Sequence, residues 1–384
     1  MKFLKHARLS VIAVGAAIAS LSAIADVSIG INVPLTGFAA ADGKSALDGA
    51  KLAVAQANAK GGIKGEKIEL VIYDDQASPK EVVPLATKLI EKDKVVGVVG
   101  GSYSGPSRAA ASVFQAAQVP YVVAYAIHPD VTRAGDFMFR TSAMGEVQGR
   151  GGAKLVSNLG KKNVVVITVK NDFGQSLAAG FKEGAAKFGL NILGEHEFSM
   201  PERQFGALIA KVKEQNPEVI YASGYFFNAG PLVNQLRAAG VTVPIIGQEG
   251  YDSDKFIEIA GPASEGVLIT TSLDRDSASP ATKGFLADFK KAYSSGADMV
   301  AAATYTATEI LIEGLGKTGG KGGAALRDAI AAGKYDTAIG KLTFNDLHEV
   351  NKDIQVQVVK DKAFRRHSVI SDAVLLAAPT KASK

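Results

Sequence analysis

Apolar runs alternate with glycine-rich turns and helical segments along most of the chain, and the central example lies between Val95 and Ile127. The apolar run VVGVV is followed by the turn 100–106, by the alanine-rich helical pattern SRAAASVFQAAQ and by a second apolar run, VPYVVAYAI. This order predicts a strand, a helix and a second, parallel strand. Ligands of open parallel sheets bind beyond the carboxyl ends of the strands, which is where the turn 100–106 would lie.

The same alternation fills the chain on both sides of this unit. Before it, Val27–Val33 alternates like a strand, a helix follows, KIELVIYDD predicts another strand, and a helix is expected to start at Pro79. From Met144 the series begins again, with strands predicted at Val164–Val169, in EVIYASGY and in VPIIG, and with helices between them. Two such series predict an α/β protein with two lobes, each built on a parallel sheet.

The pattern changes after Gly266. Helical periodicity covers Thr282–Tyr293 and Ala301–Gly314, and short strands are predicted at Ile339–Phe344 and Ile354–Val359. The last residues, APTKASK, have the composition of a loose chain end.

The beginning of the chain has the pattern of a secretory signal. Basic residues precede an apolar stretch that ends in the small-x-small sequence AIA at 23–25. We therefore expect export to the periplasm and cleavage after Ala25. The apolar stretch is too short for a membrane anchor, and no cysteine follows the cleavage site for attachment of a lipid.

Composition narrows the functional classes. The formal charge is +5, and Lys2, Lys5 and Arg8 of the expected signal supply part of it, so the charge balance favours no nucleic-acid partner. The chain has no cysteine and must be held by its hydrophobic cores rather than by disulfides. No later apolar run approaches membrane-spanning length, so we expect a soluble protein.

No catalytic or metal-binding constellation is visible. The triplet 172–174, DFG, lacks the other kinase motifs, the triplet 316–318 lacks the earlier glycine of a phosphate loop, and the histidines are scattered. The sequence predicts a protein that is not an enzyme and needs no cofactor or metal. In the turn 100–106, Ser104 and the free N–H groups of a helix start can receive a carboxylate. The alternative is a plain connection whose glycines only permit a tight turn.

Several stretches together resemble one family. YDDQASPKEVVPLATKLI, GVVGGSYSGPS, PYVVAYAIHPDVT, NDFGQ, GQEG, SEGVL and ATYTA occur in an order similar to that of the leucine/isoleucine/valine-binding kind of periplasmic substrate-binding protein, which serves ABC importers. The resemblance implies the type I periplasmic-binding fold, with two Rossmann-like α/β lobes, parallel sheets and three crossing hinge segments. It places lobe 1 at residues 26–143 and 273–349, and lobe 2 at residues 144–272 and 350–384.

The resemblance also implies a ligand site between the lobes. Ser104 matches the serine that receives the ligand's α-carboxylate, and Glu249 matches the acid that receives the α-ammonium. Tyr225 matches a second-lobe tyrosine that contacts the ligand, and Tyr305 a first-lobe aromatic near the cleft. Each assignment has an alternative: Ser104 could simply cap a helix, Glu249 could lie in a surface turn, and Tyr305 could be an ordinary buried helix residue.

Four positions depart from the family pattern. Ile127 stands where amino-acid binders have a second hydroxyl, Tyr125 replaces a small residue, Phe173 replaces a tyrosine and Asp42 replaces an aromatic. The cleft would then have fewer donors for a carboxylate, an extra acid, and an aromatic wall that also includes Tyr103. Aromatic walls suit planar ligands, whereas paired acids suit a cationic one, so these departures leave the ligand open.

We therefore expect a periplasmic receptor that binds an amino acid, branched-chain or related, and delivers it to an inner-membrane ABC permease. Its lobes would close around the ligand by a hinge motion. We expect a monomer with no nucleic-acid partner. The alternatives are a receptor for an aromatic or other small carboxylate, a ligand sensor that is not coupled to transport and, third, a secreted enzyme.

Overall fold

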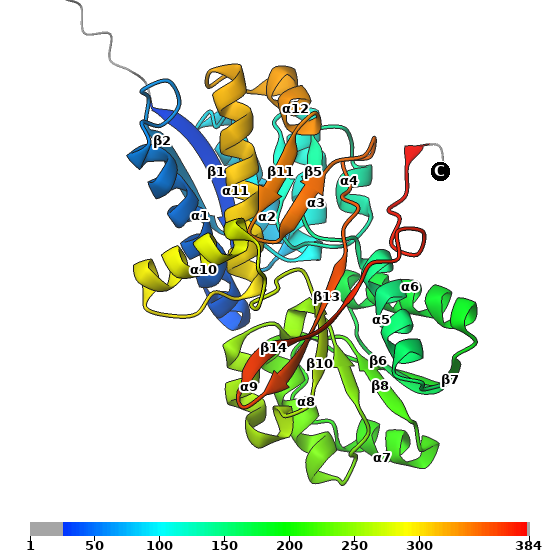
Figure 1. The fold of residues 1–384 in the computed structure, drawn as a ribbon. Coiled ribbons are helices and arrows are strands. Elements are labelled where there is room, and N and C mark those ends of the chain that lie inside the picture. Colours follow the sequence, from blue (N-terminus) through cyan, green and yellow to red (C-terminus); the bar gives the residue numbers. More distant parts are fainter. Residues whose placement is uncertain (1–25, 382–384) are drawn as a thin grey trace, which may run out of the picture.

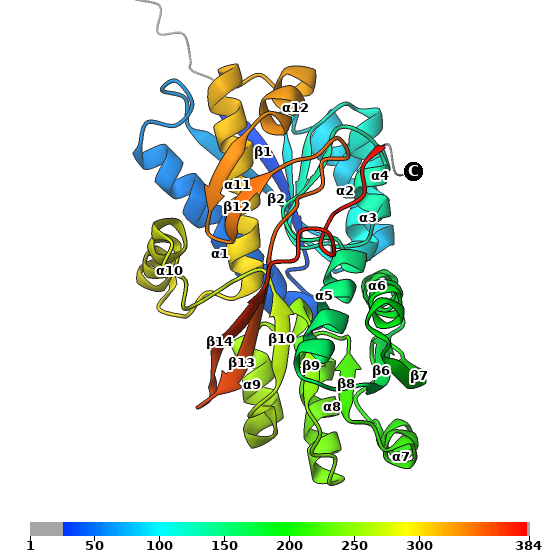
Figure 2. The same cartoon turned by 45° about the vertical axis from the view of Figure 1, so that its right-hand side comes forward.

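The computed structural model describes residues 26–381, so the predicted signal at residues 1–25 lies outside the described part. The chain forms two α/β lobes, one above the other in Figure 1, with the joining segments between them. The turned view of Figure 2 shows the same two-part shape. The expected α/β fold with two lobes is confirmed.

The first lobe is built on a five-stranded sheet in the order β2-β1-β3-β4-β5. All neighbouring strands are parallel. The strands are β1 (Val27–Val33), β2 (Ile68–Asp74), β3 (Val98–Gly100), β4 (Tyr121–Val123) and β5 (Met138–Arg140). The central strands are apolar on both faces because helices cover both sides of a parallel sheet.

The helices of this lobe come from two distant parts of the chain. The first part supplies α1 (Ala40–Ala59), α2 (Pro79–Glu91), α3 (Ser104–Ala116) and α4 (Asp130–Arg133). The second part supplies α10 (Pro280–Tyr293), α11 (Met299–Thr318), α12 (Gly323–Ala331) and the hairpin β11 (Lys334–Thr337) and β12 (Gly340–Thr343). The long helix α11 packs beside α1, as Figure 1 shows.

The second lobe is built on a seven-stranded sheet in the order β14-β13-β10-β9-β8-β6-β7. Its strands are β6 (Asn163–Val169), β7 (Asn191–Phe198), β8 (Val219–Ala222), β9 (Ile245–Gly247), β10 (Leu268–Thr271), β13 (Ile354–Lys360) and β14 (Ala363–Ile370). Its helices are α5 (Gly145–Asn158), α6 (Asp172–Phe188), α7 (Gly206–Gln215), α8 (Phe226–Ala238) and α9 (Asp254–Ala260). β13 and β14 are antiparallel to their neighbours, so this sheet is mixed rather than wholly parallel.

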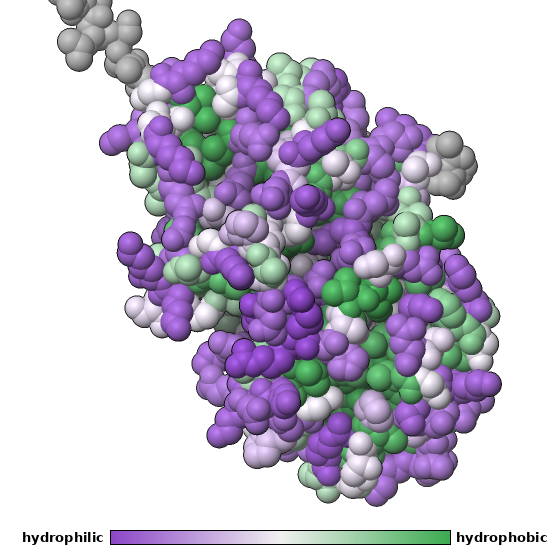
Figure 3. All heavy atoms as spheres, viewed as in Figure 1, coloured by the Kyte–Doolittle hydropathy of each residue, from purple (hydrophilic) through white to green (hydrophobic). Residues whose placement is uncertain are grey.

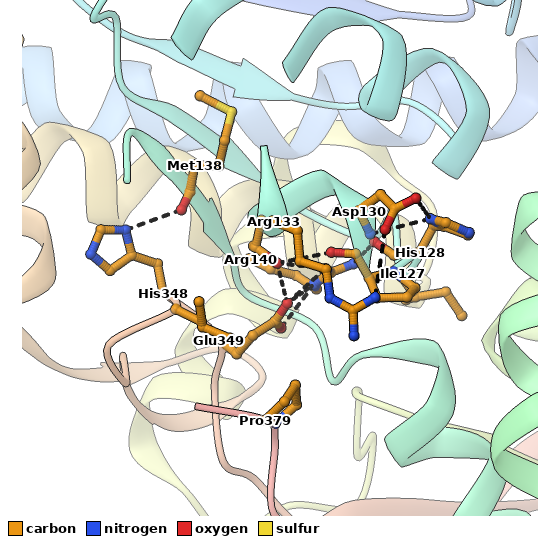
Figure 4. Close-up of polar contacts among 12 residues, drawn as sticks. Ile127, His128, Asp130, Arg133, Met138, Arg140, His348, Glu349 and Pro379 are labelled. Atoms are coloured by element: carbon orange, nitrogen blue, oxygen red, sulfur yellow. Dashed lines mark hydrogen bonds and ion pairs between the residues drawn. The ribbon is translucent and has the colours of Figure 1, made fainter. Parts of the chain in front are cut away.

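The segments that join the lobes are anchored by a buried ion pair (Figure 4). Arg140 ends β5, just before the first crossing, and Glu349 precedes the last one. The Arg140 Nε and Nη2 atoms donate to the two carboxylate oxygens of Glu349 at 2.9 and 2.7 Å, and both side chains are excluded from solvent. A bidentate pair of this kind fixes the roots of two crossing segments relative to each other.

The end of the chain does not remain loose. After β14 the chain runs back across the junction, and its last described residues, 378–381, lie beside the first lobe (Figure 1). Arg150 of α5 donates to the carbonyls of Leu375 and Ala377, and the Lys381 N–H donates to the Asp346 carboxylate. Within residues 378–381, the Ala378 N–H also donates to Asn351 and the Pro379 carbonyl accepts from Asn345, so the expectation of a loose end is wrong for these residues.

The face of the molecule in Figure 3 is mostly hydrophilic, and hydrophobic residues gather in patches on the lower lobe. Among residues 26–381, no helix combines the length and the apolar character that crossing a membrane requires.

Candidate ligand-binding site

The carboxyl ends of strands from both sheets point toward the junction of the lobes, and a cavity lies between them. The first lobe contributes Asp42, Tyr103, Ser104, Tyr125, Met299 and Val300. The second lobe contributes Phe173, Tyr225, Glu249, Gly250, Asp252 and Ser253. Most of these residues follow β3, β4, β6, β8 or β9 directly, which is the usual place for a ligand in parallel sheets.

Ser104 begins α3 and is buried at the wall of this cavity. Its Oγ atom accepts hydrogen bonds from the backbone N–H groups of Ile127 at 3.1 Å and His128 at 3.3 Å. Both contacts use the oxygen as an acceptor, so the hydroxyl proton stays free to donate to a ligand. The unpaired N–H groups of the first helical turn favour an anion at the same place.

Glu249 enters the cavity from the second lobe, in the short 3₁₀ helix Glu249–Tyr251 that follows β9. Glu249 is only 2% exposed, and neither carboxylate oxygen forms a hydrogen bond of good geometry with a described residue, although the side chain of Gln148 lies near enough to lower the pKa of Glu249. Burial raises the pKa of Glu249 to about 8. A buried carboxylate without a partner is costly, so this position favours a ligand that brings a cation.

Asp42 faces the same cavity from the first turn of α1. Its Oδ2 atom accepts a hydrogen bond of 2.6 Å from the hydroxyl of Tyr103. Burial raises the pKa of Asp42 to about 7. Two acids, one from each lobe, therefore line one enclosed space.

Four aromatic rings form much of the cavity wall. The ring of Tyr225 stacks on that of Tyr103 at 4.4 Å and lies 4.9 Å from that of Phe173, and Tyr125 meets Tyr103 edge-on at 6.3 Å. The Tyr125 hydroxyl donates to the carbonyl of Gly101, and the Tyr225 hydroxyl accepts from Asn171. The hydroxyl proton of Tyr125 is therefore used within the protein, that of Tyr225 stays free to donate, and the ring surfaces are apolar.

The lobes touch each other around the cavity. Tyr103 of the first lobe stacks on Tyr225 of the second, as described above. At the mouth, the Arg108 Nε atom lies 3.0 Å from Oδ2 of Asp172. Phe38 meets Phe227 edge-on, with ring centroids 5.2 Å apart. These contacts join the lobes in a closed arrangement.

Two predicted site residues lie elsewhere. Tyr305 of α11 packs against Phe285 at 4.7 Å and donates its hydroxyl to Gln56, so it lies on the outer side of the first lobe and not in the cavity. The prediction for Tyr305, which came from the family resemblance, is wrong, because its side chain packs against α10 and not at the cleft. The side chain of Ile127 lies against Gly145 and is not among the cavity-lining residues; only its N–H contributes, through Ser104.

Sequence reasoning missed several lining residues. Met299 and Val300 begin α11, after the chain has returned to the first lobe, and no local pattern places them beside Ser104. Gly250 packs so closely on the turn before Tyr225 that an added Cβ would lie 2.1 Å from the carbonyl oxygen of Gly224. The glycine in GQEG was the available signal for this close approach.

The acid Asp252 has its own partners. It is paired with Arg275, and its Oδ2 atom accepts a 2.6 Å hydrogen bond from the hydroxyl of Thr271. Within residues 26–381, no group of three or more His, Asp or Glu side chains could hold a metal ion. The cavity is thus equipped to bind a small molecule through hydrogen bonds, charge and aromatic contact.

Comparison with known proteins gives a consistent result. The periplasmic binding protein family matches residues 26–363. A "Leu/Ile/Val-binding protein homolog 3" from Brucella melitensis biotype 1 is 33% identical over 334 residues, which cover 86% of this chain and 90% of the relative. The branched-chain amino acid transporter substrate-binding protein LivJ of Streptococcus pneumoniae, solved with isoleucine, superposes with a TM-score of 0.83 at 26% identity, covering 90% and 99% of the two chains.

A solute-binding protein from R. palustris, solved with benzoate, has a TM-score of 0.82 at 23% identity, covering 91% and 99% of the two chains, and shows the shared fold. The family match covers most of the chain and agrees with the lobes and the cavity seen here. The chain belongs to the periplasmic binding protein family.

Proposed function

We propose that this protein is a periplasmic receptor that binds an amino acid, branched-chain or related, and delivers it to the inner-membrane permease of an ABC importer. The observation that carries the proposal is the buried carboxylate of Glu249, which forms no ion pair with a described residue and lines the same cavity as Ser104. An α-amino acid supplies an ammonium for the first group and a carboxylate for the second. The similarity to proteins named as Leu/Ile/Val-binding and to LivJ, which was solved with isoleucine, supports this ligand class.

The ligand would be held at both ends. Its ammonium donates to Glu249 in charge-assisted hydrogen bonds. Its carboxylate accepts from the Ser104 hydroxyl and from N–H groups of the first turn of α3, whose dipole favours the negative charge. The rings of Tyr125, Phe173 and Tyr225 would cover the side chain.

Closure would couple binding to transport. The ligand touches both lobes, so it stabilises the closed form relative to an open one by the contacts that exist only when the lobes meet. A permease could then distinguish the loaded receptor by its closed surface. The protein would act as a monomer in the periplasm after cleavage behind Ala25, without catalysing a reaction on its ligand.

Calorimetry tests the proposal directly. The parent protein, freed of co-purified ligand by unfolding and refolding, should bind at least one of leucine, isoleucine and valine. Glu249→Gln should weaken that binding by about 2–5 kcal/mol because the ammonium would be buried without its anionic partner. Ser104→Ala should cost about 1 kcal/mol, since the backbone donors remain. Undiminished binding by Glu249→Gln would contradict the proposal.

The aromatic wall favours a second candidate, a receptor for a small aromatic carboxylate. Such a ligand has no amine, so it would leave Glu249 unpaired. Benzoate and 4-hydroxybenzoate should then bind the parent, and Glu249→Gln should bind them equally well or better. This opposite response of one variant separates the two candidates.

A further inference from the structure

We propose that the cavity selects amino acids that carry a second cationic group on the side chain, and that Asp42 receives this group. The inference rests on the proposed function, because Glu249 is taken to hold the α-ammonium. It extends that function by naming a ligand class, basic amino acids with short side chains, that differs from the branched-chain class.

The charges around the cavity are unbalanced. Of its acidic residues, Asp252 is neutralised by Arg275, whereas Asp42 and Glu249 are 5% and 2% exposed and form no ion pair. No lysine, arginine or histidine belongs to the described residues that line the cavity. Two carboxyl groups therefore share one dry space without a cation from the protein.

The nearby cations of the chain have other partners. Lys352 lies close enough to lower the pKa of Glu249, but its Nζ atom donates to the carbonyl of Ile339 at 3.0 Å. Arg140 is held by Glu349, as described for the hinge. Neither lines the cavity. Lys352 lowers the pKa of Glu249 without forming an ion pair with it, and no described lysine or arginine forms an ion pair with Asp42, so Asp42 is the acid that a second cation of the ligand would meet.

The surroundings of Asp42 suit a cation. The hydroxyl of Tyr103 donates to one carboxylate oxygen, which orients the group, and the rings of Tyr103, Tyr125 and Tyr225 lie around it. Aromatic faces attract ammonium and guanidinium groups when water is excluded. A carboxylate beside several tyrosine rings is thus a site for an amine rather than for a methyl group.

A ligand with a neutral side chain would bind weakly beside Asp42. A branched-chain ligand would neutralise Glu249 and leave Asp42 buried in apolar contact, where an ionised carboxyl is costly. A ligand with two positive groups neutralises both acids, and its single carboxylate still finds Ser104. The position of the two acids on opposite lobes means that such a ligand also links the lobes electrostatically.

Ligand pairs of equal shape test the inference. L-Ornithine is compared with L-norleucine, and L-2,4-diaminobutyrate with L-norvaline, by calorimetry on the ligand-free parent. In each pair, the side chains differ by an ammonium in place of a methyl group. The basic member of at least one pair should bind about tenfold more tightly or better, as expected for a charged hydrogen bond in a closed site.

Variants then assign the effect to Asp42. Asp42→Asn keeps the shape and removes the charge, so the ratio between the paired ligands should fall to near one or invert. Asp75→Asn is the matched control: Asp75 is a buried acid of the same lobe that accepts hydrogen bonds from Asn32 and from the Ala77 N–H and does not line the cavity. It should keep the parent's ratio. Thermal unfolding of each variant verifies that it is folded.

Each outcome has a defined meaning. If the neutral members or the branched-chain amino acids bind and the basic members bind no better, the inference is overturned and the proposed function stands. If basic ligands are preferred equally by the parent and by Asp42→Asn, the assignment to Asp42 is overturned. If no amino acid binds and benzoate does, the proposed function falls and the inference with it.

Discussion

Glu249 is a buried ionisable residue that forms no ion pair with any residue between 26 and 381. Its pKa of about 8 lies above its ordinary value of 4.5, so the folded state holds the proton more tightly than the unfolded state. Stability of the unliganded protein should therefore be lost as the pH rises from about 4.5 through about 8. This pH dependence follows from the burial of the Glu249 carboxyl group in the cavity.

Glu249→Gln should remove that dependence. In urea unfolding without ligand, parent and variant should be similar near pH 4.5, and the variant should be more stable at pH 9 by an amount on the order of a few kcal/mol. Parent and variant share all their other titratable groups, so subtracting their free energies of unfolding removes the contribution of those groups. If the free energies of unfolding of variant and parent differ by the same amount at pH 4.5 and at pH 9, Glu249 is already paired in the free protein.

The residues of the site could be predicted from the sequence only in part. Ser104 was identified from its glycine-rich turn, because a strand, a turn and a helix define where a donor group will lie. Glu249 and Tyr225 came from family resemblance, since pairing two lobes across a cleft leaves no local pattern. Tyr305 was misplaced for the same reason: α11 is apolar on nearly all sides, so its sequence does not show which side meets the ligand.

At the scale of elements, the hinge depends on the pair of Arg140 and Glu349. Glu349→Ala would leave the guanidinium buried without an anion and should lower the free energy of unfolding by about 3–5 kcal/mol. Urea unfolding measures the loss. The double variant Arg140→Met, Glu349→Leu should recover much of it, because no charge is then left unpaired. If Glu349→Ala lowers the free energy of unfolding by less than about 1 kcal/mol, the pair does not have this role.

The terminal segment makes a second prediction at this scale. Leu376 is 3% exposed and packs with Ile354 and Leu155 of the second lobe, whereas Val374 is 81% exposed. Leu376→Ala should destabilise the protein by about 2–4 kcal/mol, and Val374→Ala, the matched control, should have almost no effect. Thermal unfolding distinguishes them. Equal small effects would indicate a segment that is loose in solution.

Buried strands could be predicted from the sequence, including the three-residue strands β3, β4 and β9, whereas an exposed edge strand could not. β1, β6 and β13 are apolar runs and were found near their true bounds. β14 was missed because it lies at a sheet edge and reads AFRRHSVI, with charged residues on its exposed positions. Strands of this kind are defined by pairing with β13, which the local pattern does not contain.

At the scale of the whole molecule, the cavity exists because the two lobes meet. Across the cavity the lobes meet through the Tyr103–Tyr225 stack, the Phe38–Phe227 contact and the ion pair of Arg108 with Asp172. The ion pair is partly exposed and contributes at most about 1 kcal/mol. We therefore expect the ligand-free protein to open in solution.

Small-angle scattering measures this opening. The radius of gyration should be larger without ligand than at saturation, and the saturated profile should match the closed arrangement seen here. Tyr103→Ala should increase the ligand-free radius further or leave the protein fully open, because it removes the main contact between the lobes. A radius that is the same with and without ligand would contradict hinge closure while leaving binding untouched.

The most direct test of the account is a crystal structure of the protein saturated with the amino acid that calorimetry identifies as its ligand. The account predicts a ligand enclosed between the lobes, with its ammonium within hydrogen-bonding distance of the Glu249 carboxylate and its carboxylate at the Ser104 hydroxyl and the start of α3. A ligand bound outside this cavity, or one whose carboxylate faces Glu249, would contradict it.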